Sequence, residues 1–369
     1  MLFVFQLFIS VAVVQALYYL VVFRKLAFAK SKHYTPEKFP PVSIVICAKN
    51  EAENLLKNLK VILIQHYPKY EVILVNDQST DNTLDVIAEY CQRNDNIRVF
   101  NIKPDVNKPF QGKKFALQIG VQQAKYDTIV VTDADCKPMT IQWLENLVSG
   151  YLNETKIVLG YAPFFKENTF LNKFIRFENV MTAMQYLSFA KLGMPYMGVG
   201  RNLSFKKNMF DAKVYEKNKD IPSGDDDLFV NAVANSSNTE VSLSKDSFMY
   251  SEAKKTWKEW MQQKLRHTRS GRFYKFHHRI ALALYPLSNL IFYVTAVILV
   301  TQIHLLLPVL LIFLGILFIK MWFVNRVNGK LQQSDLNSLT LLFDITYTLY
   351  LYLIFLLSLF ATKDKWKEI

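Results

Sequence analysis

Long apolar segments at both ends of this chain enclose a polar central region. Residues 2–23 are almost continuously apolar. Three further apolar segments follow the central region, at residues 284–301, 305–324 and 339–360. Because about 20 apolar residues in a helix span the hydrocarbon core of a bilayer, each segment is a candidate membrane helix. The sequence therefore predicts an N-terminal transmembrane helix over residues 1–23, transmembrane or re-entrant segments over residues 283–361, and a water-exposed domain between them.

The basic residues next to the first apolar segment indicate how the chain is oriented. Residues 24–39 form a basic linker, with Arg24, Lys25, Lys30 and Lys32 placed after the apolar run. A cleaved signal peptide carries its positive charge before the apolar run, so this order favours an uncleaved anchor. Positive charges stay preferentially on the cytoplasmic side, which predicts a cytoplasmic central domain in a multi-pass protein of the inner or plasma membrane.

The overall charge and the cysteines narrow the class of partner. The formal net charge of +13 fits either nucleic acid or an anionic membrane surface or substrate. Since the basic residues lie beside apolar segments, we expect the membrane as the partner and no nucleic acid. The 3 cysteines have no CxxC spacing and no histidines at zinc-binding spacing, so they predict reduced cytosolic thiols and no structural zinc.

The C-terminal part carries basic stretches whose placement conflicts with three full crossings. Residues 256–282 are rich in basic and aromatic side chains and predict a helix on the membrane surface. Three crossings after it would put the basic link at Arg326 and Lys330 on the opposite side from the basic tail, residues 362–369. A re-entrant or interfacial segment would remove this conflict. Asp344, inside the last apolar segment, either lies near the interface, pairs within the protein or marks a shallow re-entrant helix, because a charge at mid-bilayer costs about 2.5–3.5 kcal/mol.

The central region, residues 40–255, alternates short apolar strands with longer amphipathic helices. The expected strands cover residues 42–47, 71–76, 97–101 and 128–132. The expected helices cover residues 51–65, 83–92 and 112–124. This alternation predicts an α/β fold with a Rossmann-like, mostly parallel sheet covered by helices. Ligands bind such sheets beyond the carboxyl ends of the strands, so the polar residues after each strand form the candidate site.

Two acidic clusters follow predicted strands directly. In residues 75–83, Asp77 and its polar neighbours either bind a base or ribose by hydrogen bonds or cap the next helix. Asp133 and Asp135 lie two residues apart after a buried strand and are able to converge on one Mg²⁺ or Mn²⁺ ion that also accepts diphosphate oxygens. A metal-free loop is the alternative, because this spacing of acids is common in loops.

Three further features admit both a chemical and a structural interpretation. Three adjacent aspartates, residues 225–227, open a helix whose N-terminus they stabilise, but their crowding also raises proton affinity and suits a general base. Lys113 follows a glycine at a helix start and either contacts a phosphate or lies on the surface. Gln263 and Arg266 share one helix face, as a functional pair or as part of a basic membrane-surface helix.

The order and spacing of these features resemble the membrane-bound family 2 glycosyltransferases with a GT-A fold. Within that family the chain is similar to the bacterial poly-N-acetylglucosamine synthase type, over residues 41–269. The resemblance implies an inverting transfer of a sugar from a nucleotide-diphosphate sugar, expected to be UDP-linked, to a lipid or saccharide acceptor. The first strand and turn, residues 42–51, resemble the part of the family fold that holds the nucleotide.

The matching motifs imply a role for each site residue. The implied nucleotide-sugar-binding residues are Ala48, Glu51, Asp77, Lys113, Asp133 and Gln263. The implied ligands of Mg²⁺ or Mn²⁺ are Asp133 and Asp135, with Asp135 favoured as the direct ligand. The implied catalytic residues are Asp225 or Asp226 as the base, with Asp225 slightly favoured, and Arg266 beside the leaving diphosphate. The implied acceptor-side residues are Gly198, Gly200, Asn202 and His267.

The sequence departs from the family pattern at two motifs. Asn76 and Gln78 replace the usual Asp and Gly around Asp77, and His267 stands where the processive members have a Trp that supports the growing chain. This second change, with few membrane segments to build a channel, favours single addition to a lipid or short saccharide. The alternatives are a processive polysaccharide synthase of the poly-N-acetylglucosamine type and a catalytically degenerate membrane assembly protein.

Overall fold

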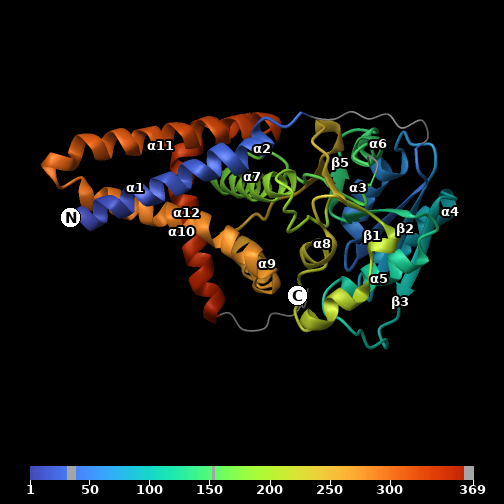
Figure 1. The fold of residues 1–369 in the computed structure, drawn as a ribbon. Coiled ribbons are helices and arrows are strands. Elements are labelled where there is room, and N and C mark those ends of the chain that lie inside the picture. Colours follow the sequence, from blue (N-terminus) through green and yellow to red (C-terminus); the bar gives the residue numbers. More distant parts are fainter. Residues whose placement is uncertain (31–38, 152–153, 361–369) are drawn as a thin grey trace.

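The structure is a computed structural model that describes residues 1–30, 39–151 and 154–360. It places a sheet covered by helices next to a group of long apolar helices (Figure 1). The expected basic tail, residues 362–369, and half of the expected linker over residues 24–39, namely residues 31–38, lie outside the described residues.

A seven-stranded sheet forms the centre of the domain, with the strand order β3-β2-β1-β4-β7-β6-β8. Its strands are β1 (Val42–Ala48), β2 (Tyr70–Asp77), β3 (Ile97–Ile102), β4 (Thr128–Asp133), β6 (Ile157–Leu159), β7 (Leu203–Lys206) and β8 (Thr239–Val241). The first four strands pair in parallel, whereas β7 is antiparallel to β4 and β6. A second, antiparallel pair joins β5 (Cys136–Pro138) to β9 (Met249–Ser251). The predicted mostly parallel α/β sheet is therefore confirmed.

Helices cover both faces of this sheet because alternate residues of each strand point to opposite sides. Ile44 belongs to an apolar cluster with the helices α3 (Ala52–Leu63), α4 (Thr83–Arg93) and α6 (Trp143–Val148). Its neighbour Val45 belongs to the other cluster, with α5 (Lys114–Gln123). Burial on both faces explains why these strands are continuous apolar runs.

Three more helices belong to the domain outside the two groups that cover the first strands. They are α7 (Phe170–Lys191), α8 (Asp227–Val233) and α9 (Trp257–Thr268). A capping box between Thr256 and Glu259 starts α9. The basic, aromatic stretch over residues 256–282 is not one helix, because α9 ends at Thr268 and a 3₁₀ turn, Ser270–Phe273, separates it from α10 (Phe276–Leu299).

Among the described residues, four helices are long and apolar enough to cross a membrane. The first is α1 (Leu2–Leu17), which continues through a π-helical turn, Tyr18–Phe23, into α2 (Arg24–Ala27). The others are α10, α11 (Ile303–Lys330) and α12 (Thr340–Phe360). In Figure 1, α1, α10 and α11 run along one another, whereas α12 runs across them.

A polar cluster joins the last three apolar helices and resolves the position of Asp344. The Asp344 carboxylate lies 3.2 Å from the ammonium of Lys320 in α11 and accepts a hydrogen bond of 2.5 Å from the hydroxyl of Tyr293 in α10. One turn further along α12, the Thr348 hydroxyl accepts a 2.7 Å hydrogen bond from the Asn289 amide. Of the three alternatives for Asp344, pairing within the protein is therefore observed.

Candidate active site

The carboxyl ends of three neighbouring strands bring the first site residues to one edge of the sheet. Ala48 ends β1, Asp77 ends β2 and Asp133 ends β4, and the register places Cys47 of β1 opposite Asp133. Asp77 is fully buried and lies 2.6 Å from the ammonium of Lys108. Burial raises the pKa of Asp77, an effect that Lys108 counteracts.

Two turns beyond β1 and β2 are tied together at this edge. Asn50 has a left-handed backbone (φ 54°), and its side-chain oxygen accepts a 2.8 Å hydrogen bond from the Thr80 N–H. The Glu51 N–H donates to the Thr83 hydroxyl at 2.8 Å. Asp81 accepts from the Thr83 N–H at 3.0 Å. Asp81 and Thr83 thus hold the turn before α4, whose N-cap residue Asn82 makes no side-chain capping hydrogen bond, while Asp77 lies buried at the strand end.

Lys113 occupies the centre of the site and joins its two acidic clusters. Its ammonium lies 2.6 Å from a carboxylate oxygen of Asp133 and 3.0 Å from one of Asp225. Burial alone would lower the pKa of Lys113, but the charges of Asp133, Asp225 and Asp226 outweigh burial and raise that pKa well above its ordinary value. Lys113 is therefore a fixed cation between clusters that are about 90 residues apart in the chain.

The Asp133–Asp135 turn has the geometry of a site for a hard divalent cation. One ligand atom each from Asp133, Asp135 and Cys136 lies within 4.8 Å of the other two. Although Asp135 is exposed to solvent, the surrounding protein and then the charges of Asp133 and Glu51 raise its pKa. Burial, and then the charges of Asp135 and Asp133, raise the pKa of the Cys136 thiol well above its ordinary value. The two carboxylates are hard oxygen donors, and such donors suit Mg²⁺ or Mn²⁺.

The three adjacent aspartates face different partners. Asp225 pairs with Lys113, and Asp226 accepts a hydrogen bond from the Gly200 N–H. Asp227 points away from both, because one carboxylate oxygen accepts from the hydroxyls of Ser270 at 2.5 Å and Tyr274 at 2.7 Å. The structure thus places Asp225 and Asp226 at the site and uses Asp227 to hold α8 against the segment after α9.

Asp226 has the proton affinity expected of a crowded, enclosed acid. Burial, and then the charges of Asp225 and Asp227, raise the pKa of Asp226 to about 8, although Lys113 opposes the shift. A carboxyl group with a pKa near neutrality is suited to accept a proton from a hydroxyl.

The helix α9 lies across the site from the sheet. The Arg266 carbonyl accepts a 3.0 Å hydrogen bond from the Ser223 hydroxyl, which attaches α9 to the loop of the three aspartates. Gln263 is half-buried and His267 is exposed. Enclosure by protein, followed by the charges of Lys264 and Arg266, lowers the pKa of His267 well below its ordinary value even though solvent reaches the ring.

The acceptor-side segment contains both open and enclosed residues. Gly200 lies against Lys113 and Asp226, so that an added Cβ would be 3.1 Å and 3.2 Å from their side-chain ends. Gly198 packs on apolar side chains below. Asn202 is fully buried, donates to the carbonyls of Tyr161 and Ser247, and accepts from the Trp143 indole. Its side chain therefore supports the segment from within rather than lying at the open face.

Two cations near the site carried no distinctive sequence signal. Lys108 neutralises Asp77 from a loop with no recognisable motif. Arg201 directly follows Gly200, donates to the Ser251 hydroxyl at 2.6 Å and stacks on Phe164 at 4.5 Å. Its charge opposes the rise in the pKa of Asp135. The only indication of its role in the sequence is its position directly after Gly200, a glycine whose backbone lies against the site.

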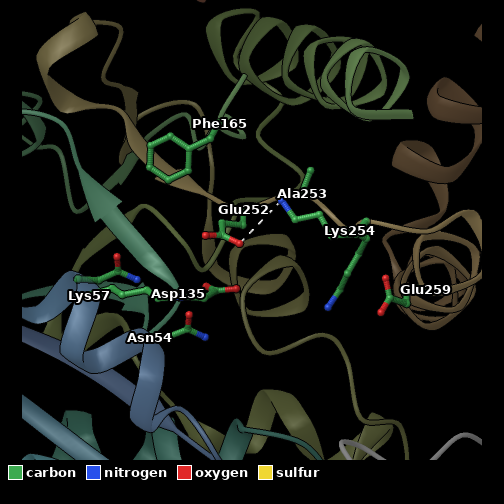
Figure 2. Close-up of a pocket in the computed structure, with 10 residues that line it drawn as sticks. Asn54, Lys57, Asp135, Phe165, Glu252, Ala253, Lys254 and Glu259 are labelled. Atoms are coloured by element: carbon green, nitrogen blue, oxygen red, sulfur yellow. Dashed lines mark ion pairs between the residues drawn. The ribbon is translucent and has the colours of Figure 1, made fainter. Parts of the chain in front are cut away.

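A cavity of about 250 Å³ opens beside Asp135 (Figure 2). It lies between α3, the segment that precedes α9, and α9 itself. Its lining includes Asp135, Phe165 and Glu252 together with the lysines Lys57 and Lys254. An aromatic wall with surrounding carboxylate, amide and ammonium groups is able to bind a polar ligand that also has an apolar face.

Sequence comparisons place this chain in one family. The profile of glycosyl transferase family 2 matches residues 43–212. The profile of glycosyl transferase family group 2 matches residues 128–325, which is more than half of the chain. The chain belongs to the family 2 glycosyltransferases, as the sequence motifs predict.

Individual relatives are similar over part of their length. The probable glycosyltransferase YdaM of Bacillus subtilis (strain 168) is 33% identical over 151 residues, which cover 39% of this chain and 35% of that protein. A poly-beta-1,6-N-acetyl-D-glucosamine synthase of Staphylococcus epidermidis is 32% identical over 127 residues, which cover 33% of this chain and 29% of that protein. The matched region thus spans about a third of the length of these relatives.

A solved structure has the same fold over almost the whole chain. It is the mannosyltransferase PcManGT from Pyrobaculum calidifontis in complex with GDP-Man and Mn²⁺, with a TM-score of 0.54 and 16% identity. The likeness covers 92% of this chain and 98% of that chain. The expected GT-A fold is therefore confirmed.

Proposed function

We propose that this chain is a membrane glycosyltransferase that transfers a sugar from a nucleotide-diphosphate sugar to a lipid or saccharide acceptor, with inversion at the anomeric carbon. The observation that carries the proposal is the position of Lys113 between Asp133 and Asp225. The Lys113 ammonium thus connects two groups of acids. Asp133 and Asp135 are suited to hold the donor and its metal, and Asp225 and Asp226 are suited to accept a proton.

On the donor side, the strand ends supply the binding groups. Ala48, Glu51 and Asp77 would contact the nucleoside, and Lys113 would contact the phosphates once a donor competes for its charge. Asp133 and Asp135 would hold Mg²⁺ or Mn²⁺, which when bound neutralises a departing diphosphate. The Mn²⁺ in the PcManGT complex supports this choice of ion.

On the acceptor side, a carboxylate would remove the proton of the attacking hydroxyl. The acceptor oxygen bonds to the anomeric carbon as the bond from that carbon to the diphosphate oxygen breaks. The proton passes to Asp225 or Asp226, and the nucleoside diphosphate leaves with the bonding electrons. Asp226, whose pKa is raised to about 8, has an affinity suited to this step. Arg266, Gln263 and His267 on α9 would line the acceptor or leaving-group side.

The proposed location is the cytoplasmic face of the inner or plasma membrane. Four apolar helices long enough to cross a bilayer support membrane insertion. The basic residues Arg24 and Lys25, together with Arg326, lie at the domain end of these helices. The positive-inside preference then places the domain in the cytoplasm.

Transfer by the purified full chain tests the proposal. The enzyme, reconstituted in lipid nanodiscs, is incubated with a panel of labelled UDP- and GDP-sugars, with Mg²⁺, Mn²⁺ or a chelator. We expect release of nucleoside diphosphate only with a divalent ion, and its loss in Asp135→Asn and Asp225→Asn. The exposed Asp85→Asn variant should keep full turnover. Substantial turnover in Asp135→Asn would contradict the metal assignment.

A processive synthase is the second candidate, because a relative named poly-beta-1,6-N-acetyl-D-glucosamine synthase is 32% identical over 127 residues. Sizing the products made from UDP-N-acetylglucosamine separates one added sugar from many. An absence of turnover with every donor, in a protein that remains folded, would instead favour the degenerate assembly protein.

A further inference from the structure

The apolar helix α12 is as hydrophobic as the crossing helices but packs in a different place. A distinct apolar cluster joins α1, α10 and α11, with Phe8, Phe292 and Val309 among its buried members. Phe292 stacks on Phe8 at 5.2 Å and on Phe313 at 5.4 Å. No side chain of α12 that the structure describes belongs to this cluster.

The buried face of α12 instead follows the catalytic domain. Three rings of α12 contact α7: Phe343 and Tyr347 lie 5.3 Å and 6.1 Å from Phe177, and Tyr350 lies 5.3 Å from Phe174. These side chains belong to the large apolar cluster that holds the domain core, which also takes in Tyr285 of α10 and Phe323 of α11. At 1.5 Å per residue, the three contacts with α7 cover about 10 Å of helix. A helix that left the domain to cross the bilayer would not keep these contacts over two turns.

Polar contacts join α12 to two of the other apolar helices within a single turn, as expected of a helix that lies across them. Asp344 contacts both Lys320 of α11 and Tyr293 of α10, and Thr348 accepts a hydrogen bond from Asn289 of α10. The view in Figure 1 agrees, since α12 runs across α10 and α11.

The outer face of α12 is apolar and exposed. Its exposed large side chains include Leu341, Ile345, Leu349, Leu353 and Leu356. α10 and α11 also expose large apolar side chains, among them Val297 and Phe318. Lipid acyl chains are therefore the occupant that the outer face of α12 fits. A water-exposed position would leave these side chains unburied.

We propose that α12 lies in the plane of the membrane, in the leaflet next to the catalytic domain, and does not cross the bilayer. This proposal rests on the membrane location proposed above. With α1, α10 and α11 as the three crossings, the chain does not cross again after Arg326. The conflict predicted between the basic link at Arg326 and Lys330 and the basic residues 362–369 then does not arise.

The in-plane helix also supports the site. Phe174 of α7 lies 5.3 Å from Tyr350 of α12 and 5.6 Å from Trp257 of α9. Ring contacts through Phe174 therefore connect α12 to α9, the helix that carries Gln263 and Arg266.

Cysteine labelling of the full chain tests which side the tail occupies. In a background with Cys47→Ser and Cys91→Ser, single cysteines are introduced as Thr301→Cys, Ser334→Cys or one residue appended after Ile369. A membrane-impermeant maleimide is applied to sealed vesicles of known orientation. We expect the appended cysteine to react from the same side as Ser334→Cys and from the side opposite to Thr301→Cys. Reaction from the Thr301 side would overturn the proposal.

Depth measurements separate an in-plane helix from a re-entrant one. Spin labels at Leu341→Cys, Leu349→Cys and Leu356→Cys should lie within about one helical turn, 5 Å, of the same depth. A matched series in α11, at Leu307→Cys, Leu314→Cys and Phe318→Cys, should change steadily in depth. A clear maximum at Leu349 would overturn the in-plane geometry. Carbonate extraction of the protein from membranes would instead contradict the membrane location itself.

Discussion

Gly112 and Pro222 are in backbone contact, and this contact fixes the distance between the two halves of the site. Gly112 has a left-handed backbone (φ 71°), and a Cβ added to it would lie 2.1 Å from the carbonyl oxygen of Pro222. Lys113 directly follows Gly112 in the chain, and Pro222 begins the short loop that leads to Asp225. The 3.0 Å pair between that lysine and that aspartate therefore depends on a close approach that only glycine permits.

Gly112→Ala should consequently lower both stability and activity. The left-handed backbone alone costs about 1–2 kcal/mol for a residue with a Cβ, and the overlap with Pro222 must also move the loop. We expect a loss of about 2 kcal/mol or more, measured as a lower midpoint of thermal unfolding, with little remaining transfer. Gly271→Ala is the matched control, because a Cβ there meets nothing within 4 Å. Equal stability of the two variants would contradict the contact.

Substitutions of the adjacent lysines 113 and 114 should affect different properties: the first should lower activity and the second should lower stability. Lys113→Met removes the cation between Asp133 and Asp225, so kcat/KM should fall about 100-fold, as for the loss of one charge-stabilising donor. Lys114 is buried and donates to the carbonyls of Asn218 at 3.0 Å and Ile221 at 2.7 Å. Lys114→Met should therefore destabilise the fold by about 1–3 kcal/mol, since both carbonyls lose this donor and the Asn218 carbonyl keeps only its hydrogen bond from the Ile221 N–H.

Kinetics and thermal unfolding of both variants check this difference. The exposed Lys60→Met is the control for loss of a surface charge and should change neither property. A Lys113→Met variant with wild-type kcat/KM would remove the central observation behind the proposed function.

The stability of the metal-free and donor-free protein should depend on pH through Asp226. Its pKa in the folded state is about 8, well above the ordinary value of an aspartate. The folded state therefore holds a proton that the unfolded state has lost, and this contribution to stability falls as pH rises from about 4 to about 8. Asp226→Asn should gain stability relative to the wild type as pH rises through this window.

Unfolding midpoints of the two proteins at pH 5 and pH 8 test this expectation. The two proteins must be compared with each other because His267 also makes stability depend on pH. Its pKa is lowered in the folded state, so its contribution to stability increases as pH rises to about 6.5, in the wild type and in the variant alike. Lys114, whose pKa is lowered to about 8, likewise contributes stability that increases with pH, but only above about pH 8. A constant difference between wild type and variant across the window would refute the assignment, and Asp85→Asn should track the wild type.

The strands that carry the site were predictable, whereas the elements that complete it were not. β1, β2 and β4 are largely apolar runs because they are buried on both faces, and β2 and β4 end in the aspartates that the sequence indicates. β6 and β8 are only three residues long, which is too short for a periodic pattern. The 22-residue helix α7 gives no clear amphipathic pattern, because 16 of its residues are buried and polar residues such as Arg176 and Glu178 are among them.

The site itself was predictable as separate motifs but not as one arrangement. Lys113, Asp133 and Asp225 each follow from a local motif, yet their contacts join residues far apart in the chain. The acidic triplet is another example, since only the hydroxyls of Ser270 and Tyr274 show that Asp227 is turned away. Asn202 lies in a segment whose Gly200 contacts Lys113 and Asp226, but whether the Asn202 side chain points outward depends on packing that a single sequence does not contain.

The polar cluster between the apolar helices leads to the last prediction. Lys320 and Asp344 are both buried, and the pair is enclosed by the rings of Phe292 and Tyr293. Removing one charge leaves the other unpaired in an apolar region, which costs about 3–5 kcal/mol for buried pairs. We therefore expect Lys320→Met to lower the unfolding midpoint of the detergent-solubilised protein strongly, and to weaken the attachment of α12.

The double variant Lys320→Met with Asp344→Leu tests whether the ion pair stabilises the protein or instead fixes where α12 crosses α10 and α11. Replacing both charges by apolar groups removes the desolvation cost together with the attraction, so most of the lost stability should return. If the pair also fixes the crossing of α12, the double variant should regain its midpoint but show broader spin-label depths at Leu349→Cys. A double variant no more stable than Lys320→Met would show instead that the pair stabilises the helices by itself.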